Sequence, residues 1–365
     1  MPKPERTFVE KITTIAGVIA ALGGVLAAAT QFSDQVKALL GKLAELPPVA
    51  WWVIAGLLLS LGIFGLIHGL ARRSRLLRPE ALLLKSHKAE HLKGRDEDID
   101  RLLRLCRDYP LVHLVGESGA GKSALLQAGL CPKLRQDSAG LLPIYIEVWG
   151  QDWEAGPRSA LTEAFWQALS EPDRQALNLN SFDHPDGLFA ALKRCQPSLR
   201  RTPLLIFDQF DDYQTRHRSR FLSSRQRTWL GAEKLMAANA FWREIKTLLD
   251  HDAIHCLFVT RSDTADGLES VRFVAPQVYA LERLQEAVVQ PLLTELTSSA
   301  DENAPIIYAP DRGWDKLKQR LASDLSQPGA ILPAQMKIAF QGLARLKTLT
   351  IGDYQRIGGL PGLEA

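Results

Sequence analysis

The residues best suited to chemistry form one run of eight, Gly116-Glu117-Ser118-Gly119-Ala120-Gly121-Lys122-Ser123. The run fits the pattern G-x-x-x-x-G-K-[ST] of a phosphate-binding loop, or P-loop. Its glycines can adopt dihedral angles that turn backbone N–H groups toward phosphate oxygens. The ammonium of Lys122 can reach the β- and γ-phosphates, and the hydroxyl of Ser123 can ligate Mg²⁺. These residues therefore predict binding of a nucleotide together with Mg²⁺.

A second group of polar residues follows an apolar run that we predict to be a buried strand, Leu204 to Asp208. After a P-loop strand, a carboxylate in the place of Asp208 is expected to hold Mg²⁺, usually through water. Asp211 and Asp212 come three and four residues later. One of the two is placed to polarise the water that attacks the γ-phosphate. Taken alone, the pattern would indicate only a strand that ends in a turn.

Arg261 ends a third predicted strand, Ile254 to Thr260. An arginine at the tip of a core strand can contact a γ-phosphate and respond to its presence. The spacing is equally consistent with a surface ion pair to Asp263 or Asp266. The sequence leaves both interpretations open.

The elements that must position these residues alternate between helix and strand. An amphipathic helix is predicted over residues 96–107 and a buried strand over residues 111–115, directly before the P-loop. A helix must follow the P-loop and direct the positive end of its dipole at the phosphates. The predicted fold is therefore α/β, with a parallel sheet covered by helices on both faces.

Composition limits the class of protein. The chain has 365 residues, of which 23% are charged and 46% hydrophobic, as in globular proteins. This excludes a disordered chain, a collagen-like fibre and a disulfide scaffold. A net charge of +3 gives no sign of a sequence-specific nucleic-acid partner. The four cysteines lack the spacing of zinc ligands and indicate thiols in a reducing compartment.

The region before residue 72 has a different composition, with only nine charged residues. Residues 12–32 and 49–71 are uncharged and long enough for two transmembrane helices. Basic residues precede the first stretch and follow the second, which predicts a multi-pass protein of the inner membrane with both termini cytoplasmic. The lipid bilayer is then a partner, and residues 73–93 form a basic juxtamembrane linker. Cleavage of the first stretch as a signal peptide is the alternative.

A further basic run, residues 216–227, follows the acidic residues and contains five arginines. It is either a solvated charge run or a loop that contacts lipid, nucleic acid or the phosphate of a neighbouring subunit.

The order of the motifs resembles that of the STAND class of P-loop NTPases, and most closely the bacterial novel STAND branch. Gly94-Arg95-Asp96-Glu97 is similar to the Gly-Arg-Glu motif that lies near the adenine, and Asp208-Gln209-Phe210-Asp211-Asp212 to the acidic motif Asp-Gln-Phe-Glu-Glu. Thr260-Arg261-Ser262-Asp263 resembles the sensor strand. The segment 328–333, with Pro333, resembles the Leu-Pro motif of a helical lid, and Tyr354 with the segment 358–362 resembles the close of the module.

This resemblance implies a nucleotide-binding core over residues 94–282 and a small helical lid domain over 283–365. It implies ATP and ADP as ligands, with Gly94, Arg95 and Pro333 joining the P-loop in binding them. It also implies a switch driven by slow hydrolysis, a homo-oligomer in the active state and a role in conflict or antiphage signalling. The membrane hairpin would be the anchor or the effector.

The chain departs from the family pattern at three places. Its acidic pair is Asp-Asp rather than Glu-Glu, which leaves the identity of the base open between Asp211 and Asp212. The Leu-Pro motif is followed by Ala334 and Gln335 rather than leucine. The sequence stops at Ala365, where a winged helix and a sensor would begin, so a shortened form or a separate sensor or trigger protein is expected.

Two other functions fit the same motifs. A membrane-tethered motor or assembly ATPase of the AAA+ kind would hydrolyse ATP continuously, about 1–10³ times per second. An interaction scaffold would hold the nucleotide only as a structural ligand. The rate of turnover separates the motor from the switch, and exchange of the hairpin for an unrelated one separates the scaffold from an effector.

Overall fold

Five short apolar runs form one parallel sheet, in the order β3-β4-β5-β2-β6. Most of their residues are buried, as in strands that are covered on both faces. The order places β5 between the P-loop strand β2 and the acidic strand β4. The strands are β2 (Leu111–Gly116), β3 (Leu141–Ile146), β4 (Thr202–Phe207), β5 (His255–Arg261) and β6 (Gln277–Leu281).

Alternate residues of the strands enter two separate apolar cores. On β4, Leu205 and Phe207 pack on one side, and Leu204 and Ile206 pack on the other. The first core is closed by α7 (Arg158–Ala168), α9 (Gly187–Leu199), α10 (Phe210–Arg216), α11 (Arg218–Phe221), α12 (Ala232–Ala238), α13 (Ala240–Asp250) and the 3₁₀ segment η4 (Ser262–Val271). The short helix α8 (Glu171–Ala176) precedes α9.

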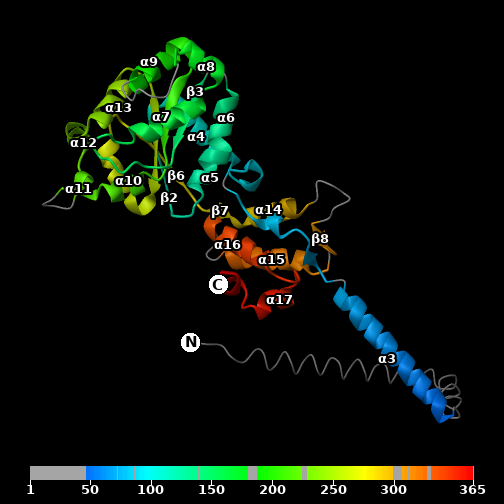
Figure 1. Cartoon of the computed structure of the whole chain (residues 1–365). Coiled ribbons are helices and arrows are strands. Elements are labelled where there is room, and N and C mark those ends of the chain that lie inside the picture. Colours follow the sequence, from blue (N-terminus) through cyan, green and yellow to red (C-terminus); the bar gives the residue numbers. More distant parts are fainter. Residues whose placement is uncertain are drawn as a thin grey trace. The chain divides into compact units, whose positions relative to one another are not determined.

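The second core lies between the sheet, α4 (Asp96–Asp108) and the helix that follows the P-loop. That helix runs continuously through α5 (Lys122–Ala124), the π-helical segment η3 (Leu125–Leu130) and α6 (Cys131–Gln136). The wider π turn ends at Leu130, two residues before Pro132, which has no N–H to donate to that turn. Helices on both faces confirm the predicted α/β arrangement (Figure 1).

A third apolar core joins the helices of the C-terminal part, which lie together in Figure 1. Trp314, Phe340 and Tyr354 are among its fully or almost fully buried side chains. Its elements are β7 (Leu284–Gln285), η5 (Glu286–Val288), α14 (Val289–Thr297), β8 (Ile307–Tyr308), α15 (Trp314–Leu325), β9 (Ala330–Ile331), α16 (Pro333–Leu343), α17 (Ile351–Arg356) and α18 (Leu360–Glu364).

The segment expected to be a basic linker contributes to this helical part. Its strand β1 (Arg75–Leu76) pairs antiparallel with β8, and Leu82 in η1 (Pro79–Leu82) is fully buried in the third core. A further turn, η2 (Ala89–His91), leads toward Gly94. The chain therefore passes over the helical part before it enters the sheet.

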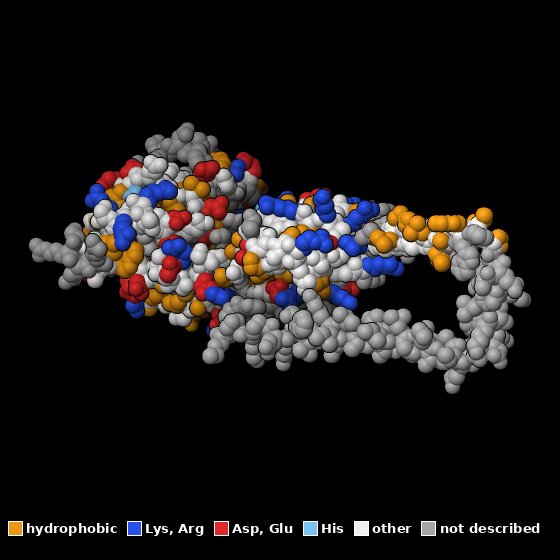
Figure 2. Space-filling view, turned by 90° about the horizontal axis from the view of Figure 1, so that it is seen from below, with side chains coloured by type: hydrophobic (Ala, Val, Ile, Leu, Met, Phe, Trp, Pro, Cys, Tyr) orange, Lys and Arg blue, Asp and Glu red, His pale blue; other side chains and the backbone are white. Residues whose placement is uncertain are grey.

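The computed structural model describes residues 47–71, 73–85, 87–137, 140–179, 187–223, 228–298, 306–310, 312–326 and 330–364. It divides into two units, Met1–Arg72 and Arg73–Ala365. The described element of the first unit is α3 (Pro48–Ala71), on which Trp52, Leu59 and other apolar side chains are exposed (Figure 2).

The predicted membrane localisation is contradicted. A spanning helix needs about 20 consecutive, predominantly apolar residues. Across the part of the chain that the structure describes, no helix, α3 included, offers a stretch of described residues long and apolar enough to cross a membrane. The predicted first span, residues 12–32, lies outside the described residues. The assignment as a multi-pass inner-membrane protein is therefore wrong.

Candidate nucleotide site

The P-loop lies where β2 ends and the next helix begins. Gly119 and Gly121 have φ values of 79° and 89°, which side chains with a Cβ rarely adopt. A Cβ on Gly116 would lie 2.9 Å from the carbonyl oxygen of Leu281 on β6. The sequence therefore needs glycine at these positions to turn the loop back over the helix N-terminus.

Lys122 folds back onto this loop. Its Nζ donates to the carbonyl oxygens of Gly116 and Glu117, at 2.8 Å and 3.0 Å. Burial lowers the pKa of Lys122, although the carboxylates of Asp208 and Asp211 act in the opposite direction. The ammonium is thus held at the loop by backbone acceptors that a phosphate oxygen could replace.

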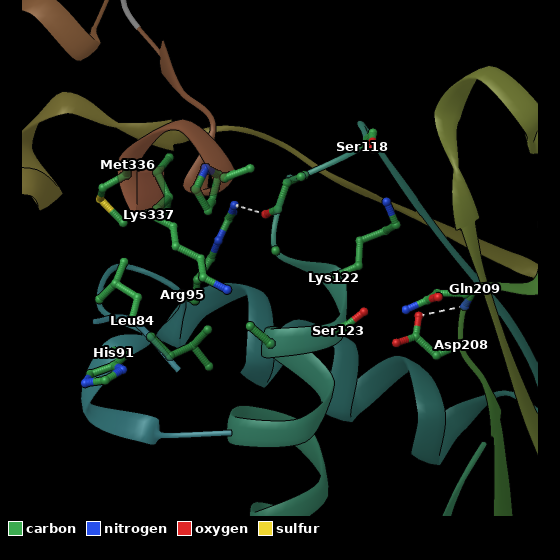
Figure 3. A pocket seen from close by; sticks show the side chains of 18 of the residues that line it. Leu84, His91, Arg95, Ser118, Lys122, Ser123, Asp208, Gln209, Met336 and Lys337 are labelled. Carbon is green, nitrogen blue, oxygen red and sulfur yellow. Dashed lines mark hydrogen bonds between the residues drawn. The ribbon is translucent and has the colours of Figure 1, made fainter. Parts of the chain in front are cut away.

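Asp208 follows the last residue of β4 and is almost fully buried. Its Oδ1 accepts from the backbone N–H of Gln209 at 2.9 Å, and its Oδ2 accepts from the Tyr145 hydroxyl at 2.5 Å. Its carbonyl oxygen accepts from Trp149 Nε1 at 3.0 Å. Gln209 has a left-handed φ of 53°, which turns the chain directly into α10. The carboxylate therefore has one orientation, at the edge of the sheet beside the P-loop helix (Figure 3).

Asp211 and Arg261 form an ion pair across this edge. Arg261 Nε lies 2.9 Å from Asp211 Oδ2, at angles outside those of a hydrogen bond, and 3.4 Å from Asp263 Oδ1. Burial is the main reason that the pKa of Asp211 is raised, and Arg261 offsets only part of this effect. Asp212 is exposed and also lines the pocket. The ion pair to Asp263 matches the surface alternative for Arg261, while its place in the pocket keeps it near the predicted phosphates.

Arg95 connects three parts of the site. Its guanidinium donates to Asp98 Oδ2 at 2.9 Å, to the carbonyl oxygen of Ala120 at 3.0 Å and to that of Glu282 at 2.8 Å. Its side chain is 5% exposed. Gly94 precedes it at a φ of 75°, and a Cβ there would lie 2.5 Å from Val288 Cγ2. Arg95 thus joins the start of α4, the P-loop and the end of β6.

The N-terminus of α16 rests directly on the P-loop. The backbone N–H of Ala334 donates to the carbonyl oxygen of Gly119 at 3.1 Å, and a Cβ on Gly119 would lie 2.6 Å from Ala334 Cβ. Pro333 lies over Gly121, because a Cβ there would be 3.5 Å from its Cγ. On the other side, Arg283 forms a two-pronged ion pair with Glu117, at 2.6 Å and 3.0 Å. The helical part and the loop therefore share backbone and side-chain contacts.

These residues surround a cavity of about 470 Å³. Lys122, Ser123, Asp208, Asp211, Asp212 and Arg261 line its polar end. Leu84, Leu92, Leu284 and Met336 line an apolar end, beside Arg95, His91 and Lys337 (Figure 3). A slot with one apolar and one polar end suits a flat base joined to a phosphate chain.

The cavity contains most of the residues predicted from sequence. Arg95, Ser118 to Ser123, Asp208, Asp211, Asp212, Arg261 and Pro333 all line it. Gly94, Gly116 and Glu117 support its wall through backbone packing or the ion pair. Sequence reasoning missed the apolar end, because Leu84, His91 and Leu92 fall in the segment interpreted as a basic linker. It also missed Tyr145, for which no local pattern gave a signal.

The donor set at the polar end fits Mg²⁺. Mg²⁺ prefers oxygen ligands and keeps several of its waters. The Ser123 hydroxyl and the Asp208 carboxylate supply such oxygens, and each Asp208 oxygen accepts one hydrogen bond from protein and retains a free lone pair. Among the described residues there is no group of three or more His, Cys, Asp or Glu side chains that could hold a metal ion by themselves. The phosphate chain and water would supply the remaining ligands.

A parallel sheet covered on both faces, with a P-loop at the end of one strand and a carboxylate at the end of another, defines a P-loop NTPase. The profile of the family described as novel STAND NTPase 1 matches residues 84–363. The chain belongs to this family. This confirms the STAND class indicated by the order of the motifs, and membership implies binding of a nucleotide, usually with Mg²⁺.

Comparison with solved structures finds distant similarities. A Walker-type ATPase of Pyrococcus abyssi is 14% identical, with a TM-score of 0.46 over 78% of this chain and 73% of that chain. The ORC2 protein of Aeropyrum pernix in its ADP form is 11% identical, with a TM-score of 0.47 over 78% and 70%. PCH-2 of C. elegans is 11% identical, with a TM-score of 0.36 over 80% and 72%. Comparison with curated proteins finds no match.

Proposed function

We propose that this chain is a Mg²⁺-dependent ATP switch, in which residues 94–282 bind the nucleotide and residues 283–365 act as a lid. The observation that carries the proposal is the hydrogen bond from the Ala334 N–H to the carbonyl oxygen of Gly119. The lid touches the loop that would wrap the phosphates, so occupancy of the cavity and position of the lid are coupled. The same contact would also serve a rapidly cycling ATPase, so the rate of turnover is the quantity that separates the two functions.

The residues have distinct roles in this proposal. The P-loop amides and Lys122 bind the β- and γ-phosphates, and Ser123 and Asp208 hold the metal. When bound, Mg²⁺ neutralises charge that develops on the phosphate oxygens. Asp211 or Asp212 orients the attacking water, and Asp211 is the more buried of the two. Because Asp211 is paired with Arg261, hydrolysis is expected to be slow until that ion pair opens.

Adenine is our choice of base, on the strength of the motif resemblance and the apolar end of the cavity. From the same resemblance we propose a homo-oligomer in the active state, a separate sensor or trigger protein, and a signalling role in bacterial defence against phage. A phage challenge of cells that carry the wild type or Lys122→Ala tests the defence role. Equal protection by the two would rule out a nucleotide-dependent defence function.

The first test is the nucleotide content and turnover of the purified chain, wild type beside Lys122→Ala. Lys133→Ala is the matched control, because Lys133 makes an exposed ion pair with Asp100 away from the cavity. We expect wild type and control to retain ATP or ADP and to turn over far below the range of about 1–10³ per second of ordinary enzymes. Fast, unstimulated hydrolysis would favour the AAA+-type motor. If the purified wild type contains no nucleotide and does not bind added nucleotide, the proposal is refuted.

A further inference from the structure

A tyrosine on the neighbouring strand holds the Asp208 carboxylate. β3 pairs with β4, so that Tyr145 lies opposite Ile206, two residues before Asp208. The Tyr145 hydroxyl donates to Asp208 Oδ2 at 2.5 Å, the shortest of the contacts to that carboxylate. The phenol is half-buried between the sheet and the P-loop helix. A hydrogen bond to a charged acceptor in such a place is stronger than one between neutral groups.

The same hydroxyl is tied to the helix that follows the P-loop. Gln127, in the π-helical segment η3, donates its Nε2 to the Tyr145 oxygen at 2.8 Å and to Glu147 Oε2 at 2.8 Å. Glu147 Oε2 also lies 3.3 Å from the Tyr145 oxygen. A phenol has one proton, and the nearer acceptor is Asp208. The chain of hydrogen bonds therefore runs from Gln127 through Tyr145 to Asp208.

Both oxygens of the Asp208 carboxylate are held by donors from the protein, and the Tyr145 hydroxyl holds Oδ2. Asp208 Oδ1 is fixed in turn by the Gln209 N–H. Each Asp208 oxygen thus uses one lone pair for a hydrogen bond from the protein and keeps a second lone pair for another donor. Hydrated Mg²⁺ needs such an oriented acceptor for a water in its coordination shell.

We propose that Tyr145 is a positioning residue for the metal, which orients the Asp208 carboxylate and couples it through Gln127 to the P-loop helix. This inference rests on the proposed function, since it concerns the same metal. Outer-shell partners of metal ligands change metal affinity about 10- to 100-fold when they are removed. Affinities of metal and nucleotide for one site are linked reciprocally, so the loss of metal affinity must reappear in nucleotide binding.

The test measures the dissociation constant of ATPγS for the full chain, once in EDTA and once in saturating Mg²⁺. The ratio of the two constants is the Mg²⁺ enhancement. For Tyr145→Phe we expect the enhancement to fall about tenfold or more, toward that of Asp208→Asn, while the constant in EDTA stays within about twofold of wild type. A role in general packing would instead change binding in EDTA.

The matched control is Tyr354→Phe. The Tyr354 hydroxyl also donates to an aspartate, Asp324 Oδ2 at 2.8 Å, but between α17 and α15 in the lid. This variant loses the same kind of bond and should leave both constants unchanged. If Tyr145→Phe does not fold by circular dichroism, Gln127→Leu takes its place, because it removes the donor to the phenol and keeps the ring. Its expected effect is a smaller fall in the same direction.

The outcomes separate the two proposals. If the wild type binds no ATPγS, the proposed function fails. If the wild type shows Mg²⁺ enhancement but Tyr145→Phe, or Gln127→Leu in its place, leaves that enhancement unchanged, the proposed function survives and the role of Tyr145 is overturned. Weaker binding of ATPγS by Tyr145→Phe in EDTA also overturns the role of Tyr145. A wild type that binds ATPγS without Mg²⁺ enhancement overturns both the role of Tyr145 and the Mg²⁺ dependence of the proposed switch.

Discussion

Replacement of Arg95 by methionine tests whether the three hydrogen bonds of its guanidinium stabilise the fold around the site. Methionine approximates the apolar stem of arginine and removes all five N–H donors. The carbonyl oxygens of Ala120 and Glu282 and one oxygen of Asp98 then lose their partner. Breaking a buried charge pair costs about 3–5 kcal/mol. We expect the lower end of that range, since Asp98 is 23% exposed and also accepts a hydrogen bond from Tyr279.

The assay is thermal unfolding followed by circular dichroism, without nucleotide. For a domain of 150–250 residues, a loss of 1 kcal/mol lowers the melting temperature by about 2–4 °C. The larger unit is longer than that, so we use the smaller factor and, with a loss of about 3 kcal/mol, expect a fall of about 6 °C.

The control for this experiment is Arg107→Met. Arg107 also pairs with an aspartate at 2.8 Å, but Arg107 and Asp137 are 44% and 35% exposed. Exposed pairs contribute about 0–1 kcal/mol, which corresponds to a fall of at most about 2 °C. If Arg95→Met melts within about 2 °C of Arg107→Met, the three bonds of Arg95 are not a major source of stability, and our account of this residue is wrong.

Three further predictions concern the lid and the acidic edge. Gly119→Ala introduces a Cβ 2.6 Å from Ala334 Cβ, at a backbone φ of 79°. We expect the Ala334 amide to exchange with deuterium about tenfold faster in this variant. An unchanged exchange rate would show that the lid is not docked on the loop. Gly342→Ala places a Cβ 2.5 Å from the Leu363 carbonyl oxygen and should lower the free energy of unfolding, measured with denaturant, by about 1–3 kcal/mol. The control is Gly352→Ala, whose nearest neighbouring atom would be 4.0 Å from the new Cβ, and it should be neutral or stabilising. Since burial raises the pKa of Asp211 in the folded chain, its contribution to stability is present below its ordinary pKa of 3.8 and is lost as pH rises through the higher folded pKa. Asp211→Asn should therefore raise the melting temperature at pH 7 but not below pH 3.8, and a lower melting temperature at pH 7 would show that the pair with Arg261 outweighs burial.

Local chemistry made the polar half of the site predictable. The two P-loop glycines at positive φ, the lysine after them and the carboxylate after a buried strand are each dictated by residues close in sequence. Alternation of helices with apolar runs gave the parallel sheet for the same reason. The position of Arg95 followed from motif resemblance, because no local pattern places its guanidinium 3.0 Å from the carbonyl oxygen of Ala120.

The apolar half of the site was not predictable. Leu84 and Leu92 lie in a segment rich in lysine and arginine, and their role depends on Leu284 and Met336, about 200 residues later in the chain. Only the docking of the lid brings these four side chains to one cavity. The predicted membrane localisation, which rested on two long uncharged stretches and the basic residues that flank them, is contradicted, because no helix of the described residues is long and apolar enough to span a membrane.

Tyr145 shows most clearly why a motif does not describe a whole site. Asp208 could be recognised from the strand it follows, but its partner depends on which strand lies beside β4 and in which register. A shift of one residue would turn the Tyr145 side chain to the opposite face of the sheet and away from the carboxylate. Gln127 adds a second dependence, on the π turn that precedes Pro132. If nucleotide binds as proposed, phosphate oxygens replace the loop carbonyls as acceptors for Lys122. A resulting movement of the loop is transmitted to α16 through the hydrogen bond at Gly119, and to the Asp208 carboxylate through Gln127 and Tyr145.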